Sequence, residues 1–371
     1  MNSFIAVENG DLLAGIQSFL RRLLETGAVQ AIYVPIRVDG GAIVPALVTE
    51  QRWLEQADPL SPVMPINGAR AVSALTGKHP PARLGAVLRS CEIRALLELV
   101  KLQQVSLDGL SLISVDCPGT SELGDYETLN RNGGFDLERF LESACAGAGP
   151  QGLPLRPACQ ICLQPAYEAV NVHLQLFGAD VRQGIPVVLR DEIALELGQA
   201  AQYDPADGRK QVMDQLLSRR GQKRQAELSA IRDRLSSNGG MASLFATCLR
   251  CHNCMTACPI CYCKTCLFRS EAMSHPPEYY LNAARRKGAV RLLSDTLLFH
   301  MTRLNHMATS CVSCGMCTSA CPADIQVGTI FSAISEQVQA AFGYQPGVDV
   351  GEPLPLITFQ PNEWTEIGEG R

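Results

Sequence analysis

The sequence lacks any long apolar run: no stretch approaches the roughly 18 residues that a membrane-spanning helix needs. It has no excess of basic residues either, since 32 Lys and Arg against 37 Asp and Glu give a net charge of −5. This balance excludes the basic surface typical of proteins that bind nucleic acids. The first residues show no basic segment followed by an apolar one, so we expect no signal peptide and a cytoplasmic protein.

The motifs of several common enzyme classes are missing as well. The sequence contains no Walker motif, no HExxH, no Ser–His–Asp pattern and no paired carboxylates, and its 6 histidines lack metal-ligand spacing. Without a G-x-G-x-x-G fingerprint, a dinucleotide would not sit in a Rossmann phosphate loop. We therefore predict no catalytic side chain and expect any chemistry to belong to a cofactor.

Cysteine, in contrast, is abundant, with 16 in 371 residues. Disulfide scaffolds are short secreted chains, whereas this chain is long and shows no secretory signal. Its composition, 46% hydrophobic and 19% charged, is that of a folded protein of two or three domains. The cysteines therefore indicate metal binding.

The pattern along the chain predicts four parts. Residues 1–190 alternate strand-like and helical segments, which is typical of an α/β domain with a mixed sheet covered by helices. Residues 191–240 are charged and helix-forming and are interpreted as a helical connector. Residues 241–345 are mainly α-helical around the cysteine blocks, and residues 346–371 are a proline-rich extended tail that we expect to dock on a partner.

The connector carries a basic cluster that permits two interpretations. A solvated helix face is favoured over a surface for an acidic partner, because runs of charge on helices are usually solvated. The cluster consists of Arg219, Arg220, Lys223 and Arg224.

Two cysteine blocks have the spacing C-x2-C-x2-C-x3-C-P of two-cluster ferredoxins. In such proteins the first three thiolates of a block hold one 4Fe–4S cluster, and the fourth holds the other cluster. Zinc is disfavoured because it uses four ligands in two pairs, not two such runs. Cluster A is thus predicted to be held by Cys248, Cys251, Cys254 and Cys321, and cluster B by Cys258, Cys311, Cys314 and Cys317.

Four further cysteines are less clearly assigned. Cys261, Cys263 and Cys266 directly follow the first block, and three thiols so close together favour a further metal or cluster site. The alternative is that they are free thiols or exchangeable ligands beside cluster B. Cys145 is interpreted as a small buried side chain.

A third cluster is predicted in the α/β part. Cys91 and Cys117 follow the strand-like segments LGAVLRS and LSLISVD, and Cys159 and Cys162 form a C-x2-C pair. Ligands of open α/β sheets bind at the carboxyl ends of the strands. We therefore expect these four thiols, from three segments, to converge on another 4Fe–4S cluster.

Residues 9–182 resemble the β-subunits of coenzyme F420-reducing hydrogenases and formate dehydrogenases. The resemblance is carried in order by GDLLAGIQSFLRRLLETG, LGAVLRSCEIRALLEL, SVDCPGT and PACQICLQPAYEAVNVHLQLFGAD. It implies that residues 1–190 hold FAD and a 4Fe–4S cluster, the latter on the four cysteines of the third cluster. Candidate flavin contacts are Asn67, Gly68, Arg70, Ser90, Glu92 and Arg94, although Asn67-Gly68 also reads as a turn and Arg94 as a helix-surface residue.

The two cysteine blocks are separated by 52 residues of helical pattern. This C-terminal part resembles the α-helical ferredoxin modules of heterodisulfide-reductase and fumarate-reductase subunits. Together the two resemblances imply an oxidoreductase subunit in which FAD exchanges two electrons with a small redox carrier, a deazaflavin or another. The clusters would then pass single electrons to a catalytic subunit of a formate dehydrogenase, hydrogenase or heterodisulfide-reductase-like complex. The alternative is a non-catalytic iron–sulfur wiring subunit without flavin.

Overall fold

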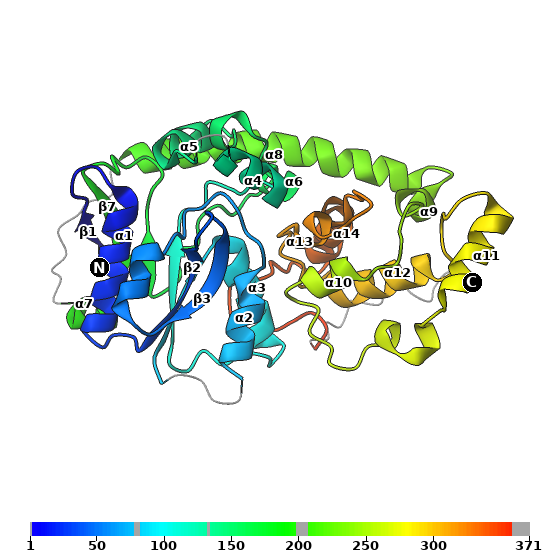
Figure 1. Ribbon diagram of the computed structural model, residues 1–371, viewed down its shortest axis with the longest axis horizontal. Coiled ribbons are helices and arrows are strands. Elements are labelled where there is room, and N and C mark those ends of the chain that lie inside the picture. The colour runs from blue at the N-terminus through cyan, green and yellow to red at the C-terminus, as the bar shows by residue number, and fades with distance from the viewer. Residues whose placement is uncertain (1, 78–81, 132–133, 198–206, 358–371) are drawn as a thin grey trace.

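The protein has an α/β domain at one end and a helical domain at the other, and one long helix runs past both (Figure 1). The computed structural model describes residues 2–77, 82–131, 134–197 and 207–357. The predicted fold class is confirmed: a mixed sheet with helices is followed by a mainly helical region.

The sheet has seven strands in the order β1-β7-β6-β5-β4-β2-β3. Its centre, from β2 through β4 and β5 to β6, is parallel, and the pairs β2–β3, β6–β7 and β1–β7 are antiparallel. Pro35 and Pro45 lie opposite each other in the edge hairpin, where a missing N–H donor is tolerated. The strands are β1 (Asn2–Ala6), β2 (Ala31–Arg37), β3 (Ile43–Val48), β4 (Leu84–Leu88), β5 (Leu110–Val115), β6 (Val172–Leu174) and β7 (Gly184–Leu189).

The helices fall into two groups, one on the sheet and one around the cysteine blocks. The first group is α1 (Leu12–Glu25), α2 (Gly68–Leu75), α3 (Ser90–Lys101), α4 (Leu123–Arg131), α5 (Leu137–Cys145), α6 (Pro157–Gln160) and α7 (Asp191–Glu196). The second is α9 (Gly240–Leu244), α10 (Asn253–Ala257), α11 (Pro277–Lys287), α12 (Thr296–Met307), α13 (Met316–Ser319) and α14 (Val327–Ala341). Short 3-10 helices cover Gln51–Gln56, Pro150–Gly152, Leu267–Arg269 and Glu271–Met273. No helix in the described ranges is both long enough and apolar enough to cross a membrane.

The connector is a single helix, α8 (Asp207–Ser236), which packs against α14, α9 and α6. The sequence favoured a solvated helix face for the basic cluster of this helix, but this interpretation does not hold for all four residues. Arg220 is buried and donates to the carbonyl of Pro118 (3.3 Å), and Arg224 pairs with Glu336 on α14 (2.9 Å). These cations therefore join the connector to both domains, because they form their bonds within the chain.

The two faces of the sheet bury different cores. One core packs α1 and α7 on the sheet, so the α/β domain continues beyond residue 190 through Leu197. The other runs without a break from β4 and α3 into the helical domain, where it includes Phe299 and Phe331. The predicted domains 1–190 and 241–345 therefore share a hydrophobic core.

The start of the C-terminal segment packs on the chain itself. The carbonyl of Pro346 accepts from Arg94 (2.9 Å), and the N–H of Gly347 donates to Glu98 (2.7 Å). The Tyr167 hydroxyl donates to the carbonyl of Val348 (2.8 Å). The tail was predicted to dock on a partner, and its first residues dock on the chain's own α3. Residues 358–371 lie outside the described part.

Candidate metal centres

The cavity predicted for cluster A is lined by Cys248, Cys251, Cys254 and Cys321, as the ligand assignment requires. Arg250 and His252 have φ of 55° and 61°, the left-handed bends by which the loop turns its cysteines inward. The loop then enters α10, whose first turn carries Cys254. Cys251 is exposed, so this cavity lies at the surface.

The cavity predicted for cluster B is lined by its four expected cysteines, Cys258, Cys311, Cys314 and Cys317. The loop between them bends through Ser313 (φ 58°) and Gly315 (φ 74°). A Cβ on Gly315 would lie 2.3 Å from Cβ of Ala158 on α6. Glycine is therefore required here, because it lets the loop of cluster B approach the α/β domain.

The fourth cysteines of the two blocks are exchanged. Cys258 belongs to the first block yet lines the cavity of the second, and Cys321 does the reverse. The short helices α10 and α13, which follow equivalent bends in the two loops, pack against each other. This exchange is the arrangement of a two-cluster ferredoxin.

A third cavity gathers Cys91, Cys117, Cys159 and Cys162. Cys91 lies in the first turn of α3, directly after β4, and Cys117 follows β5. Because β4 and β5 are parallel neighbours, their carboxyl ends lie at the same edge of the sheet. The short helix α6 supplies Cys159, and Cys162 follows two residues after its end. The Thr120 N–H donates to Cys159 Sγ (3.4 Å).

The third cavity and the cluster B cavity share a wall. Ser313 and Cys314 of the cluster B loop line both cavities. The three cavities therefore form a row in which the third adjoins B, and B adjoins A through the exchanged cysteines. Cluster A stands at the outer end of this row.

Buried arginines lie at the junctions of the row. Arg303 of α12 donates to Cys254 Sγ and to the Cys254 carbonyl (both 3.1 Å), and it lines the cluster B cavity. Arg156 lines the third cavity and donates to the carbonyl of Cys314 (3.0 Å). A guanidinium remains charged when buried, so both side chains place positive charge beside the thiols.

Burial governs the protonation of these thiols. It raises the pKa of Cys117 and Cys254 to about 11 and that of Cys314 to about 12. Burial also raises the pKa of Cys159, but Arg156 and the hydrogen bonds from Thr120 outweigh it and lower this pKa below its ordinary value. Most of these thiols are thus neutral without metal, and a cluster would displace their protons.

Unsatisfied buried nitrogens supply a test of whether the cavities fit iron–sulfur clusters. Each of the three cavities is lined by a residue with a buried nitrogen that has no partner among the described residues: His252 Nε2 at A, Arg303 Nε at B and Arg156 Nε at the third. Such groups are costly unless something accepts from them. The sulfides of a 4Fe–4S cluster are acceptors of this kind, so four thiols and a buried donor at each cavity fit the group.

His300 is a neighbour of cluster A that sequence reasoning missed. Its ring stacks on Phe245 (centroids 3.7 Å apart), and its Nε2 lies 3.4 Å from Cys248 Sγ. Burial and then the charge of Arg303 lower the pKa of His300 to about 3, so the ring is neutral. Arg156, Arg303 and His300 were missed because single residues on separate elements form no motif. Only folding brings them to the cysteines.

The three extra thiols do not converge with other ligands. Cys263 is exposed, and Cys266 Sγ lies 3.8 Å from Met255 Sδ. Burial raises the pKa of Cys261 to about 11. Among the described residues, no three His, Cys, Asp or Glu side chains are grouped closely enough to hold a single metal ion. The side chain of Cys145 lies outside the described part.

Most candidate flavin contacts are occupied by bonds within the fold. Glu92 accepts from the N–H groups of Gly68 (2.7 Å) and Arg89 (2.8 Å), and Asn67 caps α2. Arg70 donates to the carbonyl of Thr256.

Ser90 and Arg94 lie nearer the cysteines than the other four candidates. Ser90 lines the third cavity, and its hydroxyl contacts the Ala166 carbonyl (3.4 Å). Arg94 is buried against the carbonyls of Val312 and Pro346, not on a helix surface. The six candidates therefore do not surround one common cavity.

Comparison with known proteins places the cysteine blocks in a defined class. Residues 244–325 match the model of a 4Fe-4S dicluster domain. With the two cavities of exchanged cysteines, this makes the chain an iron–sulfur protein of the electron-transfer type.

Two curated relatives are similar over most of their length. The F420-dependent formate dehydrogenase subunit beta of Methanocaldococcus jannaschii is 23% identical over 313 residues, which cover 75% of this chain and 77% of the relative. The F420-dependent formate dehydrogenase 1 subunit beta of Methanococcus maripaludis is 23% identical over 391 aligned positions, which cover 94% of each. The predicted resemblance to this β-subunit family is therefore confirmed.

One solved structure is also similar, though loosely. A chain of the F420-reducing [NiFe] hydrogenase complex from Methanosarcina barkeri aligns with a TM-score of 0.46 and 10% identity, covering 62% of this chain and 92% of that one. The two curated relatives are named as subunits of formate dehydrogenases, which are oxidoreductases.

Proposed function

We propose that the chain is the electron-transfer subunit of an oxidoreductase complex and moves electrons through three 4Fe–4S clusters. The observation that carries this proposal is the row of three cavities, each with its own four cysteines, in which the third cavity shares a wall with B and the fourth cysteines of A and B are exchanged. Cysteines in this arrangement are the ligands that two-cluster ferredoxins use. The order in the row is third cluster, cluster B, cluster A.

The two ends of the row differ in exposure. The third cavity lies between the sheet edge and the cluster B loop, whereas cluster A carries the exposed Cys251. Electrons are therefore proposed to enter at the α/β domain and to leave at cluster A, or to follow the reverse path. The partner at cluster A is proposed to be a catalytic subunit of a formate dehydrogenase, hydrogenase or heterodisulfide-reductase-like complex in the cytoplasm.

At the α/β end, the proposed donor or acceptor is a small two-electron carrier, a deazaflavin such as coenzyme F420 or another. A flavin, when bound, converts between the two-electron steps of such a carrier and the one-electron steps of clusters. FAD is proposed because the resemblance of residues 9–182 to the β-subunit family implies it and because it meets this need. The chain's own part is to hold the cofactors in order and to exclude water from the third cluster and cluster B.

The flavin-free wiring subunit is the competing function, and one observation favours it. Most of the flavin contacts expected from the sequence are used in hydrogen bonds of the fold itself. A flavin thus needs a different place on the chain.

Anaerobic purification, followed by iron and flavin analysis, tests the proposal. We expect about 12 irons per chain, from three clusters of four irons, and one flavin. About eight irons without flavin would support the wiring subunit, and no cluster signal by electron paramagnetic resonance after reduction would contradict both functions.

A further inference from the structure

Positive charge is concentrated in the part of the chain that surrounds cluster A. Residues 241–310 contain 8 of the chain's 32 Lys and Arg but only 3 of its 37 Asp and Glu. This part therefore has a net charge of +5, whereas the rest of the chain has a net charge of −10. Such an asymmetry acts on partners that approach this end, because a charged surface attracts a surface of the opposite sign.

Half of these cations lie in one short segment at the end of α11. Residues 285–291 form this basic segment, and all its charged side chains are exposed cations, namely Arg285, Arg286, Lys287 and Arg291. Lys287 donates to the carbonyl of Leu292 (2.9 Å), which holds the segment as a turn. Within the described ranges, no ion pair joins the basic segment to an acidic side chain.

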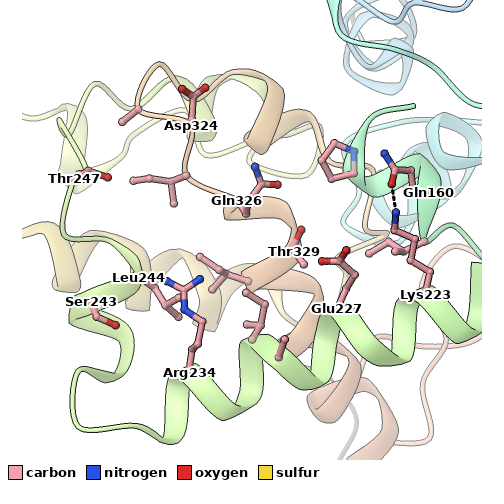
Figure 2. A pocket seen from close by; sticks show the side chains of 17 residues that line it. Gln160, Lys223, Glu227, Arg234, Ser243, Leu244, Thr247, Asp324, Gln326 and Thr329 are labelled. Carbon is pink, nitrogen blue, oxygen red and sulfur yellow. Dashed lines mark hydrogen bonds between the residues drawn. The ribbon is translucent and has the colours of Figure 1, made fainter. Parts of the chain in front are cut away.

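The connector helix shows how the chain balances charge elsewhere. Along α8, Glu227 lies between Lys223 and Arg234, and Lys223 bonds Gln160 at the groove beside α14 (Figure 2). Protein surfaces ordinarily intersperse the two signs in this way. The basic segment differs because no carboxylate stands among its cations.

Two bonds hold the basic segment beside the cluster A loop. The N–H of Leu292, directly after the segment, donates to the carbonyl of Ala246 (2.8 Å), two residues before the first ligand of cluster A. Arg250, which lies in the cluster A loop, pairs with Asp295 directly before α12. The cations therefore lie next to the exposed end of the row of clusters.

The helix that carries the first part of the basic segment is uncovered. None of the 11 residues of α11 is buried, and the helix lies at the end of the protein away from the sheet (Figure 1). A helix of this length is marginal in water unless it packs on something. Apolar side chains are exposed on it and nearby: Leu281 is 60% exposed, and Leu249 of the cluster A loop is 50% exposed. Arginine and apolar side chains together are typical of protein interfaces.

From these observations we propose that α11 and the basic segment form the docking surface for an electron-transfer protein whose surface around its own redox centre is acidic. The inference rests on the proposed function, because cluster A is one end of the electron path of that function, and it adds the chemistry by which the partner is recognised. The cations attract and orient the acidic surface, and Leu249 and Leu281 contact the docked partner. Complementary charge of this kind raises the rate of encounter and fixes the orientation.

Binding of an acidic two-cluster ferredoxin to the anaerobically purified, cluster-loaded full chain tests this surface. Both proteins are kept oxidised, and isothermal titration calorimetry gives the affinity, so the readout does not depend on electron transfer. We expect the affinity to fall at least about tenfold as salt rises from about 0.01 M to about 0.15 M, because the screening length falls from about 30 Å to about 8 Å. A basic cytochrome c should not bind at either salt concentration.

Charge reversal on the basic segment locates the effect. The triple variant Arg285→Glu, Arg286→Glu, Arg291→Glu changes exposed side chains and leaves Lys287, which bonds the turn, in place. At about 0.1 M salt we expect it to bind the ferredoxin roughly tenfold to a hundredfold more weakly than the parent, with unchanged iron content. The corresponding triple Gln variant should lie between the two.

The matched control makes the same change in net charge far from cluster A. Arg52→Glu, Arg131→Glu, Lys210→Glu alters exposed cations of the α/β domain and of the first turn of α8. It should bind the ferredoxin within about twofold of the parent, because charges more than about 10 Å away are largely screened at about 0.1 M salt.

The outcomes separate the docking surface from the proposed function. If a parent with the iron of three clusters does not bind the ferredoxin at low salt, or if both Glu variants weaken binding equally, the docking surface is overturned and the proposed function stands. Tighter binding of the parent to RNA or to vesicles of anionic phospholipid would also overturn it, because the cations would then serve another class of partner. If iron analysis of the same preparation finds no clusters, the proposed function fails and the docking surface fails with it.

Discussion

The Arg303 guanidinium donates to Cys254 Sγ at 3.1 Å and at the same time lines the cavity of cluster B. It packs between the rings of Phe299 and Phe331 and is only 4% exposed. One fixed positive charge thus serves both ferredoxin clusters. Since reduction adds negative charge to a cluster, this cation favours the reduced forms.

Arg303→Met should therefore lower the reduction potentials of clusters A and B. A unit charge about 4 Å away is worth about 4 kcal/mol at an effective dielectric constant near 20, so its loss shifts a one-electron potential by roughly 170 mV at most, at 59 mV per 1.4 kcal/mol. Redox titration followed by electron paramagnetic resonance measures the shift. Arg303→Lys keeps the charge and should shift the potentials less. Unchanged potentials in Arg303→Met would exclude the proposed role.

The contact between Gly315 and Ala158 makes a prediction about the seam between the domains. Gly315→Ala forces a residue with a Cβ into φ 74° and against a neighbour 2.3 Å away. The strained backbone should lower the free energy of unfolding by roughly 1 kcal/mol, and overpacking should lower it by about 1–3 kcal/mol more.

Gly288→Ala is the matched control, because Gly288 has nearly the same φ (72°) and no atom within 4 Å of an added Cβ. Thermal unfolding under anaerobic conditions should show a larger loss for Gly315→Ala, together with less iron per chain. Equal losses would show that the close approach of the domains has no energetic consequence.

Glu336 links the connector to α14 through Arg224 and Arg232. Burial raises the pKa of Glu336, but the hydrogen bonds and charges of Arg224 and Arg232 outweigh it and lower the pKa below the ordinary value. A carboxyl with a lowered folded-state pKa stabilises the fold above its unfolded-state pKa of about 4.5, and this contribution is lost as the pH falls further.

Glu336→Gln should therefore lower the free energy of unfolding at pH 7 by at most about 1 kcal/mol, since the pair is partly exposed. The difference from the parent should shrink at pH 4. Denaturant unfolding at the two pH values measures it. Glu127→Gln, which breaks the exposed pair with Arg131, is expected to have almost no effect at either pH. An undiminished difference at pH 4 would refute the electrostatic origin.

The grouping of the cysteines around common cavities could be predicted from the sequence for a physical reason. Three cysteines at C-x2-C-x2-C spacing are held together by the local chain, so their convergence does not depend on the rest of the fold. Cys91 and Cys117 could be paired because parallel neighbouring strands end at one edge of a sheet. In each case, short-range geometry was enough.

The flavin contacts and the connector depended on packing that no local pattern contains. Glu92 beside a cluster cysteine looked available, yet it satisfies the N–H groups that begin α2 and α3. Arg220 and Arg224 looked solvated, yet distant segments supply their partners. Such residues are assigned only once the elements that surround them are known.

The cysteines outside the cluster motif lead to the last prediction. Cys159→Ala removes a ligand of the third cavity and should lower the iron content from about 12 to about 8 per chain, with loss of one cluster signal.

The triple substitution of Cys261, Cys263 and Cys266 by Ser tests the two interpretations of these thiols. Because Cys263 is exposed and Cys266 faces Met255, we expect the triple variant to keep its iron, as free thiols would. Loss of about four irons would instead establish a further cluster, and retention of full iron by Cys159→Ala would remove the third one.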